Sequence, residues 1–194
     1  MLVSWIGLLL VAITTYVAVS MYRNSDMFQL KCVISSVDNN TYCVRDRENL
    51  HEAADLLARN TTKMRALVDH VGSKYPDEEN IKRLVDGFDP KSIVETLPTS
   101  EHTAYSENKG EKIAFCVQKY KDQKKMIDPN TLFFVSVHEL AHVATKSVGH
   151  TQEFWDNFKH LLTEAKEAGL YRPVDYNKNP APYCGMTLTD SPLF

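Results

Sequence analysis

The chain has 194 residues, of which 43% are hydrophobic and 24% are charged, and its formal net charge is −3. This length suits one globular domain that can bury a hydrophobic core without relying on disulfides or metals for its folding. Charges of both signs are mixed along the chain without a Lys/Arg-rich block, so the sequence predicts no binding to nucleic acid.

The chain begins with an apolar stretch. Residues 2–22 contain no charged side chain and are rich in Leu, Val, Ile and Ala. A helix of this length spans the roughly 30 Å of a bilayer's hydrocarbon core. We therefore expect a single-pass membrane anchor in residues 1–23, which contacts the lipid bilayer through residues 2–22, and a globular domain in residues 24–194. A cleaved signal peptide with a small-x-small site at Ala18-Val19-Ser20 is the alternative, although no Lys or Arg precedes the stretch.

The basic residues around this stretch favour one orientation in the membrane. Arg23 and Lys31 follow the apolar run, and nothing basic precedes it. Basic residues are more frequent on the cytoplasmic side of a membrane, so the globular domain is expected to face the cytoplasm.

The four cysteines fall into two candidate pairs. Cys32 and Cys43 flank a turn signal at Asp38-Asn39-Asn40, which predicts a hairpin over residues 31–44. Cys116 and Cys184 remain. In an oxidising compartment either pair can form a disulfide, and the sequons that begin at Asn39 and Asn60 can carry glycans, whereas in the cytosol the thiols stay reduced. Zinc binding by cysteines is not expected, because none of them has C-x-x-C spacing.

The middle of the chain alternates helical and extended patterns, which indicates an α+β fold. The predicted elements, in chain order, are a helix at 47–71 ended by Gly72, a helix at 75–85, a strand at 92–97, and strands at 103–105 and 112–117 that are joined by a turn at 106–110.

The strongest functional signal is the sequence His138-Glu139-Leu140-Ala141-His142. Asp128 followed by Pro129 predicts the start of a helix that contains this motif. Two histidines four residues apart lie on one face of a helix, so both imidazoles can bind one metal ion. A catalytic zinc ion has three protein ligands and one position for water, and Glu139 is placed to take that water's proton.

The third zinc ligand has two candidates. Gly149 can adopt a left-handed conformation that reverses the chain after the motif helix, and His150 would then return toward the metal. A second helix is predicted to begin near Thr151, and Glu153 in its first turn is the alternative ligand. We favour His150, because an acidic side chain in a first turn more commonly interacts with the helix dipole.

The run HELAHVATKSVGHTQEFW resembles the WLM and SprT-like zinc metallopeptidases. This resemblance implies a zincin-like domain, in which a small mixed or antiparallel sheet packs on the active-site helix. It implies zinc ligands at His138, His142 and His150, with Glu139 as the general base. It also implies that the strand at 112–117 forms the rim of the cleft, where an extended peptide substrate adds as a further strand. An ordinary core strand is the alternative for this segment.

The whole chain also resembles small membrane-anchored proteins of this kind that large DNA viruses encode, which would place it in a virion or a host internal membrane. The function we expect is that of a membrane-anchored zinc endopeptidase acting on a protein or peptide substrate. The alternative is a membrane-tethered scaffold protein, for instance of a virion, that has a zincin fold and little turnover.

The C-terminal segment offers weaker candidates. Met186 follows Cys184-Gly185 at a distance that would suit the methionine found beneath the metal in metzincins, although a core position is more common for such a residue. Tyr176 and Tyr183 are candidates for a phenol that stabilises the oxyanion, and packing is again the simpler interpretation for each.

Overall fold

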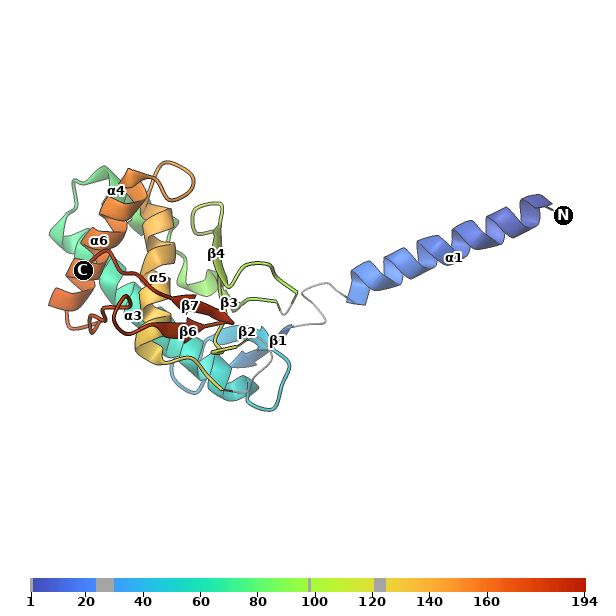
Figure 1. The fold of residues 1–194 in the computed structure, drawn as a ribbon, viewed down its shortest axis with the longest axis horizontal. Helices are drawn as coiled ribbons and strands as arrows, with labels where there is room; N and C mark the ends of the chain where they lie inside the picture. The colour runs from blue at the N-terminus through green and yellow to red at the C-terminus, as the bar shows by residue number, and fades with distance from the viewer. Residues whose placement is uncertain (1, 24–29, 98, 121–124) are drawn as a thin grey trace.

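The structure is a computed structural model that describes residues 2–23, 30–97, 99–120 and 125–194 (Figure 1). Its first helix, α1 (Leu2–Arg23), projects away from the rest of the chain, and its residues 5–22 are exposed except for the half-buried Ser20. The segment Trp5–Tyr22 is long and apolar enough to cross a membrane, and a signal sequence would have the same properties. The predicted boundary between anchor and domain falls beside residues 24–29, which lie outside the described residues.

The domain contains helices and short strands, which confirms the α+β class. Its elements, in chain order, are β1 (Leu30–Ile34), β2 (Thr41–Arg45), α3 (Leu50–Lys74), α4 (Glu79–Gly87), a 3-10 turn (Pro90–Ser92), β3 (Ile93–Glu95), β4 (Ala104–Glu107), β5 (Lys112–Phe115), α5 (Pro129–Ala144), α6 (Gln152–Glu167), β6 (Ala181–Tyr183) and β7 (Met186–Leu188).

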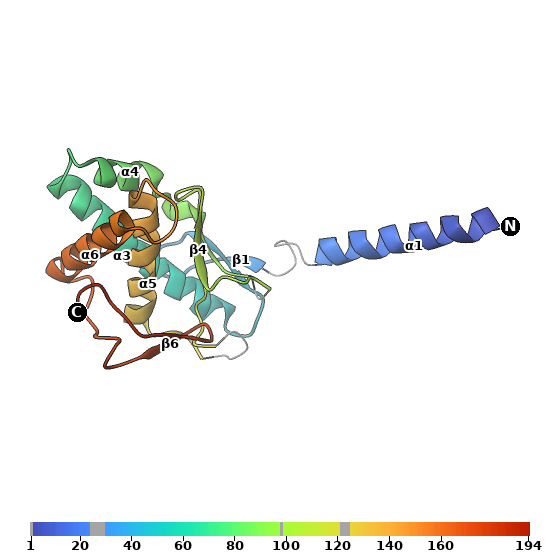
Figure 2. The same cartoon turned by 45° about the horizontal axis from the view of Figure 1, so that its top comes forward.

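Helix α5 lies in the middle of the domain. It packs against α3, α4 and α6 on one side and against β4 and β5 on the other (Figure 2). Leu132, Phe133, Val137 and Leu140 are completely buried there. An apolar helix surrounded in this way gains most of its stability from tertiary packing, and the polar side chains that it carries are held in fixed positions.

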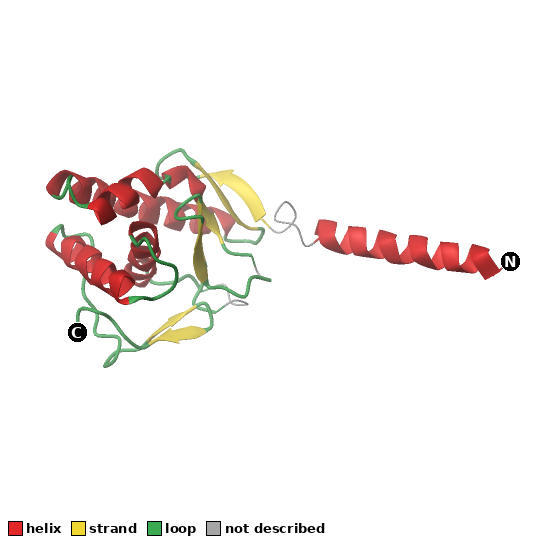
Figure 3. Ribbon diagram, turned by 90° about the horizontal axis from the view of Figure 1, so that it is seen from above, coloured by secondary structure: helices red, strands yellow, loops and turns green. Residues whose placement is uncertain are grey.

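The main sheet has the strand order β3-β5-β4. Strand β3 runs parallel to β5, with Ile93 opposite Ile113, and β4 runs antiparallel to it, with Tyr105 opposite Ala114. Strand β5 is therefore central and β4 forms an edge. Of the two alternatives for residues 112–117, the core strand is the correct one, because residues 112–115 pair with a strand on each side. The edge beside α5 belongs to β4. Figure 3 shows the helices of the domain gathered on one side of its strands.

The predicted hairpin at 31–44 is present as β1 and β2, which are antiparallel with Cys32 opposite Cys43. These two cysteines form a disulfide. In the turn, Asn39 is exposed and has a positive φ of 59°. The second sequon is inaccessible, because Asn60 is buried in α3 and its Nδ2 donates to Ser136 Oγ at 2.8 Å. The expectation that Asn60 can carry a glycan is therefore wrong for the folded domain.

Helix α3 continues to Lys74 instead of ending at Gly72 as predicted. A Cβ atom at position 72 would lie 3.0 Å from Val85 Cγ2 on α4. The glycine therefore allows α4 to approach α3 closely, and at this position it serves helix packing instead of ending the helix.

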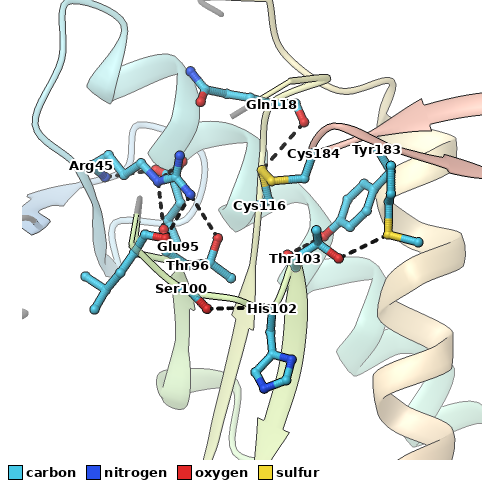
Figure 4. Close-up of a disulfide and its surroundings, with 12 residues drawn as sticks. Arg45, Glu95, Thr96, Ser100, His102, Thr103, Cys116, Gln118, Tyr183 and Cys184 are labelled. Atoms are coloured by element: carbon cyan, nitrogen blue, oxygen red, sulfur yellow. Dashed lines mark hydrogen bonds and ion pairs between the residues drawn. A yellow bond between two sulfur atoms is a disulfide. The ribbon is translucent and has the colours of Figure 1, made fainter. Parts of the chain in front are cut away.

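The C-terminal segment is ordered against the domain. Strands β6 and β7 form a two-residue hairpin whose turn residues, Cys184 and Gly185, both have positive φ, as a type I′ turn requires. A disulfide joins Cys184 to Cys116, which directly follows β5 (Figure 4). The hairpin is thereby fixed beside the main sheet and α5 (Figure 1).

Candidate metal centre

Local sequence signals fix the start of the helix that carries the motif. Asp128 is the N-cap, and its carboxylate accepts a hydrogen bond from the Thr131 backbone N–H at 2.9 Å. Pro129 occupies the first helical position, where its missing N–H costs no hydrogen bond. From this start the helix runs without interruption through His138, Glu139 and His142.

The three histidines of the sequence motif converge. The Nε2 atom of His138 lies 3.2 Å from Nε2 of His142 and 3.1 Å from Nε2 of His150. All three candidate ligand atoms lie within 4.8 Å of one another. His138 and His142 come from successive turns of α5, whereas His150 comes from the loop that follows.

The spacing of these nitrogens fits a tetrahedral zinc ion. Zinc–nitrogen bonds of about 2.0–2.1 Å in a tetrahedron place two ligand nitrogens about 3.3 Å apart. Hydrogen bonding alone does not account for the cluster, because one ring nitrogen carries either a single hydrogen or a single lone pair. His138 Nε2 can therefore form a hydrogen bond with only one of its two neighbours, whereas one cation accepts the lone pairs of all three rings.

The environment keeps two of the rings neutral. Burial, together with the neighbouring His142 and His150, lowers the pKa of His138 to about 3. Burial, together with His150 and Lys109, lowers the pKa of His142 to about 4. A neutral imidazole has the lone pair that a metal ion needs, so these histidines are in the ligating form at neutral pH.

The ring of Phe154 lies against all three imidazoles. It is fully buried at the start of α6, and its centroid lies 4.8 Å from that of His138, 4.3 Å from that of His142 and 4.7 Å from that of His150. This aromatic contact restricts the orientation of each imidazole and keeps water away from one side of the cluster.

Glu139 lies next to the histidine cluster in a buried position. Glu139 is only 4% exposed. Burial raises the pKa of Glu139 to about 8. Its carboxyl group lines a cavity of about 580 Å³ that the three histidines also line. A carboxyl group with this pKa and this position can exchange a proton with a molecule in the cavity near neutral pH.

Glu153 organises the loop that carries His150 instead of joining the histidine cluster. Its carboxylate accepts hydrogen bonds from the backbone N–H groups of Lys146 and Ser147, at 2.9 and 3.2 Å. It also contacts Arg83, at 3.4 Å. These hydrogen bonds lower the pKa of Glu153. Among the residues that the structure describes, the group of side chains that could hold a metal contains the three histidines and not Glu153.

Lys109 also stabilises the loop that carries His150. Its Nζ donates to the backbone carbonyls of His142, Thr145 and Ser147, at 3.0, 2.6 and 2.9 Å. The first two carbonyls belong to the C-terminal end of α5, where helical hydrogen bonding leaves carbonyls unsatisfied. Gly149 then reverses the chain with a φ of 85°, and His150 returns to the cluster.

One wall of the cavity is formed by strand β4. Ala104, Tyr105 and Ser106 of this strand line the cavity, on the side opposite α5 and the His150 loop. An edge strand presents backbone N–H and C=O groups that can pair with an extended peptide.

The candidates in the C-terminal segment lie in different places. Tyr176 is buried in the core against Phe134, with ring centroids 4.7 Å apart. The Tyr183 hydroxyl donates to the backbone carbonyl of Thr103 at 3.2 Å (Figure 4). Met186 is 46% exposed, so it is not the buried residue that a place beneath the metal requires.

Comparisons with known proteins find relatives in viruses. No family model matches the chain. A protein of Acanthamoeba polyphaga mimivirus, itself uncharacterized, is 28% identical over 165 residues, which are 83% of this chain and 83% of that protein. An uncharacterized protein of Invertebrate iridescent virus 6 is 43% identical over 60 residues, which are 30% of this chain and 34% of that protein. These relatives agree with the expected resemblance to viral proteins.

Among solved structures, the chain is similar to the crystal structure of Wss1 from Saccharomyces cerevisiae. The sequence identity is 16%, the TM-score is 0.46, and the match covers 66% of this chain and 90% of that one.

Sequence reasoning missed two of the residues that support the histidine cluster. Phe154 falls within the predicted second helix, and its position four residues after His150 is compatible with a contact to that ring. Lys109 gave no signal, because it belongs to a turn 33 residues before His142 in the sequence. Only the tertiary fold brings this turn to the end of α5.

Proposed function

We propose that this chain is a membrane-anchored zinc endopeptidase in which His138, His142 and His150 bind the zinc ion and Glu139 acts as the general base. The observation that carries the proposal is the convergence of the three Nε2 atoms beside a buried carboxylate that opens into the same cavity. The sequence resemblance to WLM and SprT-like metallopeptidases supports the same assignment.

Each residue of the cluster has a distinct task in this proposal. A bound zinc ion would polarise the scissile carbonyl and lower the pKa of a water molecule. In its ionised form, Glu139 would accept a proton from the attacking water and pass it to the amine nitrogen that leaves. Phe154 keeps the imidazoles in their binding orientation. Three neutral imidazole ligands leave the charge of the zinc ion largely uncompensated, which favours activation of the water.

Strand β4 is the proposed binding strand for the substrate backbone. Residues of β4 and Glu139 line the same cavity, so a peptide that pairs with β4 would pass in front of the Glu139 carboxyl group. Hydrogen bonds between backbone groups do not depend on the side chains of the peptide, so this mode of binding admits many sequences.

The proposed location rests on α1. Its apolar segment Trp5–Tyr22 would anchor the chain in a bilayer, and the domain would act on proteins at that membrane. The viral relatives support a virion or a host membrane as the site of action.

The substitution Glu139→Gln tests the proposed function. The purified full-length protein in detergent, loaded with zinc, is incubated with a mixture of unfolded proteins, and cleavage is followed by mass spectrometry. We expect Glu139→Gln to bind one zinc ion per chain and to lose at least about 100-fold in cleavage rate, because the general base contributes about 10²–10⁴-fold. The control His142→Ala should lose both zinc and cleavage.

Two results would contradict this proposal. Cleavage by Glu139→Gln at the wild-type rate would show that Glu139 is not the general base. A wild-type protein that binds zinc and cleaves nothing would favour a scaffold protein with a zincin-like domain.

A further inference from the structure

A second cavity adjoins the histidine cluster on the side of the C-terminal hairpin. Its volume is about 140 Å³, and it shares Ala104, His138 and Glu139 with the larger cavity. A group bound in the larger cavity next to Glu139 can therefore extend a side chain into the smaller one.

The walls of the smaller cavity are apolar. Phe134 and Val135 come from α5, and Met186 and Leu188 come from β7. Successive residues of a strand point to opposite faces, so these two side chains of β7 face the cavity and Thr187 between them faces away.

Two polar groups of the smaller cavity, the hydroxyls of Thr103 and Tyr183, already have partners. The Tyr183 hydroxyl donates its hydrogen to the carbonyl of Thr103 at 3.2 Å, and the Thr103 hydroxyl contacts the Met186 sulfur at 3.3 Å (Figure 4). Apart from Glu139 and His138 at its inner end, a polar side chain that entered would find few partners there.

Covalent and hydrogen bonds hold the hairpin in position. The Cys116–Cys184 disulfide joins its turn to the segment after β5 (Figure 4). The backbone N–H groups of Cys184 and Gly185 donate to the carbonyls of Gln118 and Lys119, at 3.1 and 3.0 Å. The wall formed by Met186 and Leu188 is thus supported by a fixed structure and does not depend on a bound ligand for its position.

From these observations we infer that the smaller cavity is a specificity pocket that receives an aliphatic side chain of the substrate, from a residue adjacent to the bond that is cleaved. An apolar cavity of about 150 Å³ holds a benzene molecule, so a cavity of this size accommodates the side chain of Val, Leu, Ile or Met and excludes that of Trp. The inference rests on the proposed function, because it identifies the side chain that the same site selects.

A binding experiment tests the pocket without requiring hydrolysis. The full-length zinc-loaded protein in detergent micelles is labelled with ¹³C-methyl methionine, and the signal of Met186 is identified as the one that Met186→Ala removes. The probes are the blocked tripeptides acetyl-Ala-Leu-Ala-amide, acetyl-Ala-Ala-Ala-amide and acetyl-Ala-Asp-Ala-amide. We expect the leucine peptide to shift the Met186 signal and to bind at least about tenfold more tightly than the other two, because even one methylene changes selection by about tenfold or more in an apolar pocket.

Variants of the C-terminal hairpin test whether its side chains determine the preference of the smaller cavity for the leucine peptide. Leu188→Phe fills part of the cavity and should weaken binding of the leucine peptide at least about tenfold, with a smaller effect on the alanine peptide. Thr187→Ala is the matched control on the same strand, and it should leave the affinities for all three peptides unchanged because its side chain faces away.

The outcomes separate this inference from the proposed function. If the three peptides bind equally, or if none of them shifts the Met186 signal, the pocket assignment is wrong. If the leucine peptide binds selectively and no peptide is ever cleaved, the pocket assignment holds and the endopeptidase proposal fails.

Discussion

One aromatic ring and one lysine support the histidine cluster at the scale of single residues. Phe154 contacts all three imidazoles, and Lys109 binds three carbonyls at the end of α5 and in the loop before His150. Residues that orient metal ligands typically change metal affinity by about 10–100-fold when they are replaced. The position of His150 therefore depends on Lys109 as well as on its own loop.

The substitution Lys109→Met tests this dependence. It removes the donor to the carbonyls of His142, Thr145 and Ser147, so we expect the loop to loosen and the zinc dissociation constant to rise about 10–100-fold. Competition with a chromophoric chelator measures the constant. The control Lys146→Met removes an exposed charge from the same loop and should change it less than about twofold. Equal zinc affinities for wild type and Lys109→Met would show that the lysine does not hold the site.

The residues of the metal-binding motif could be predicted from the sequence, whereas the residues that hold the histidines in position could not. His138, Glu139 and His142 lie within one helix whose cap, Asp128, is adjacent in sequence, so local rules were sufficient. His150 follows after a single loop. Lys109, in contrast, reaches the site through the pairing of β4 with β5, which no local pattern of the sequence specifies.

At the scale of elements, α3 and α6 are joined by a buried carboxylate. Glu164 on α6 accepts hydrogen bonds from Lys74 at 2.8 Å and Tyr75 at 2.6 Å and contacts His70 at 2.9 Å. Burial opposes its ionisation, but these partners outweigh burial and lower the pKa of Glu164 to about 2. Because this pKa lies below the ordinary value of 4.5, the ionised carboxylate stabilises the folded state.

The stability of the domain should depend on pH through this carboxylate. Its contribution is fully present above about pH 5 and is lost as the pH falls toward 2, where Glu164 becomes protonated in the folded state too. We expect Glu164→Gln to lower the free energy of unfolding by about 2 kcal/mol at pH 7 and to reduce its acid dependence. Urea unfolding over this pH range provides the measurement.

A neighbouring residue provides the control for this prediction. Glu167 lies on the same helix, also contacts Lys74 and is 56% exposed. Glu167→Gln should therefore cost less than about 1 kcal/mol, as expected of an exposed ion pair. An unchanged acid dependence in Glu164→Gln would mean that another group causes the loss of stability in acid.

The elements themselves were predicted unevenly. The hairpin at β1 and β2, the helices α5 and α6 and the strands β4 and β5 lie close to their expected positions. The order of the strands in the sheet was not predictable, because segments 104–107 and 112–115 are both short and extended and only their pairing with β3 decides which is central. Gly72 was wrongly predicted to end α3, because the absence of a side chain at this position leaves room for Val85 of α4.

At the scale of the whole molecule, the disulfides and the charges near α1 favour different locations for the domain. Arg23 and Lys31 favour the cytoplasmic side, whereas the two disulfides are typical of an oxidising compartment. Disulfides form in an oxidising compartment, so a domain in which both are closed would lie on the oxidising side of the membrane and not on the cytoplasmic side that the basic residues favour.

Glycosylation tests this orientation. The sequon at Asn39 is exposed in the turn between β1 and β2, whereas Asn60 is buried in α3. When the full chain is translated in the presence of microsomes, we expect a single glycan that Asn39→Gln removes and Asn60→Gln does not. A wild-type chain that inserts into the microsomes and carries no glycan would place the domain on the cytoplasmic side instead.

The central claim is that three histidines bind one zinc ion, and zinc-edge X-ray absorption of the purified full-length protein tests it most directly. We predict one zinc ion per chain with three imidazole nitrogens at about 2.0–2.1 Å. His150→Ala should reduce these to two, and Glu153→Ala should leave three. A wild-type protein that fails to retain zinc, or a Glu153→Ala variant that loses a ligand while His150→Ala keeps all of them, would contradict the account.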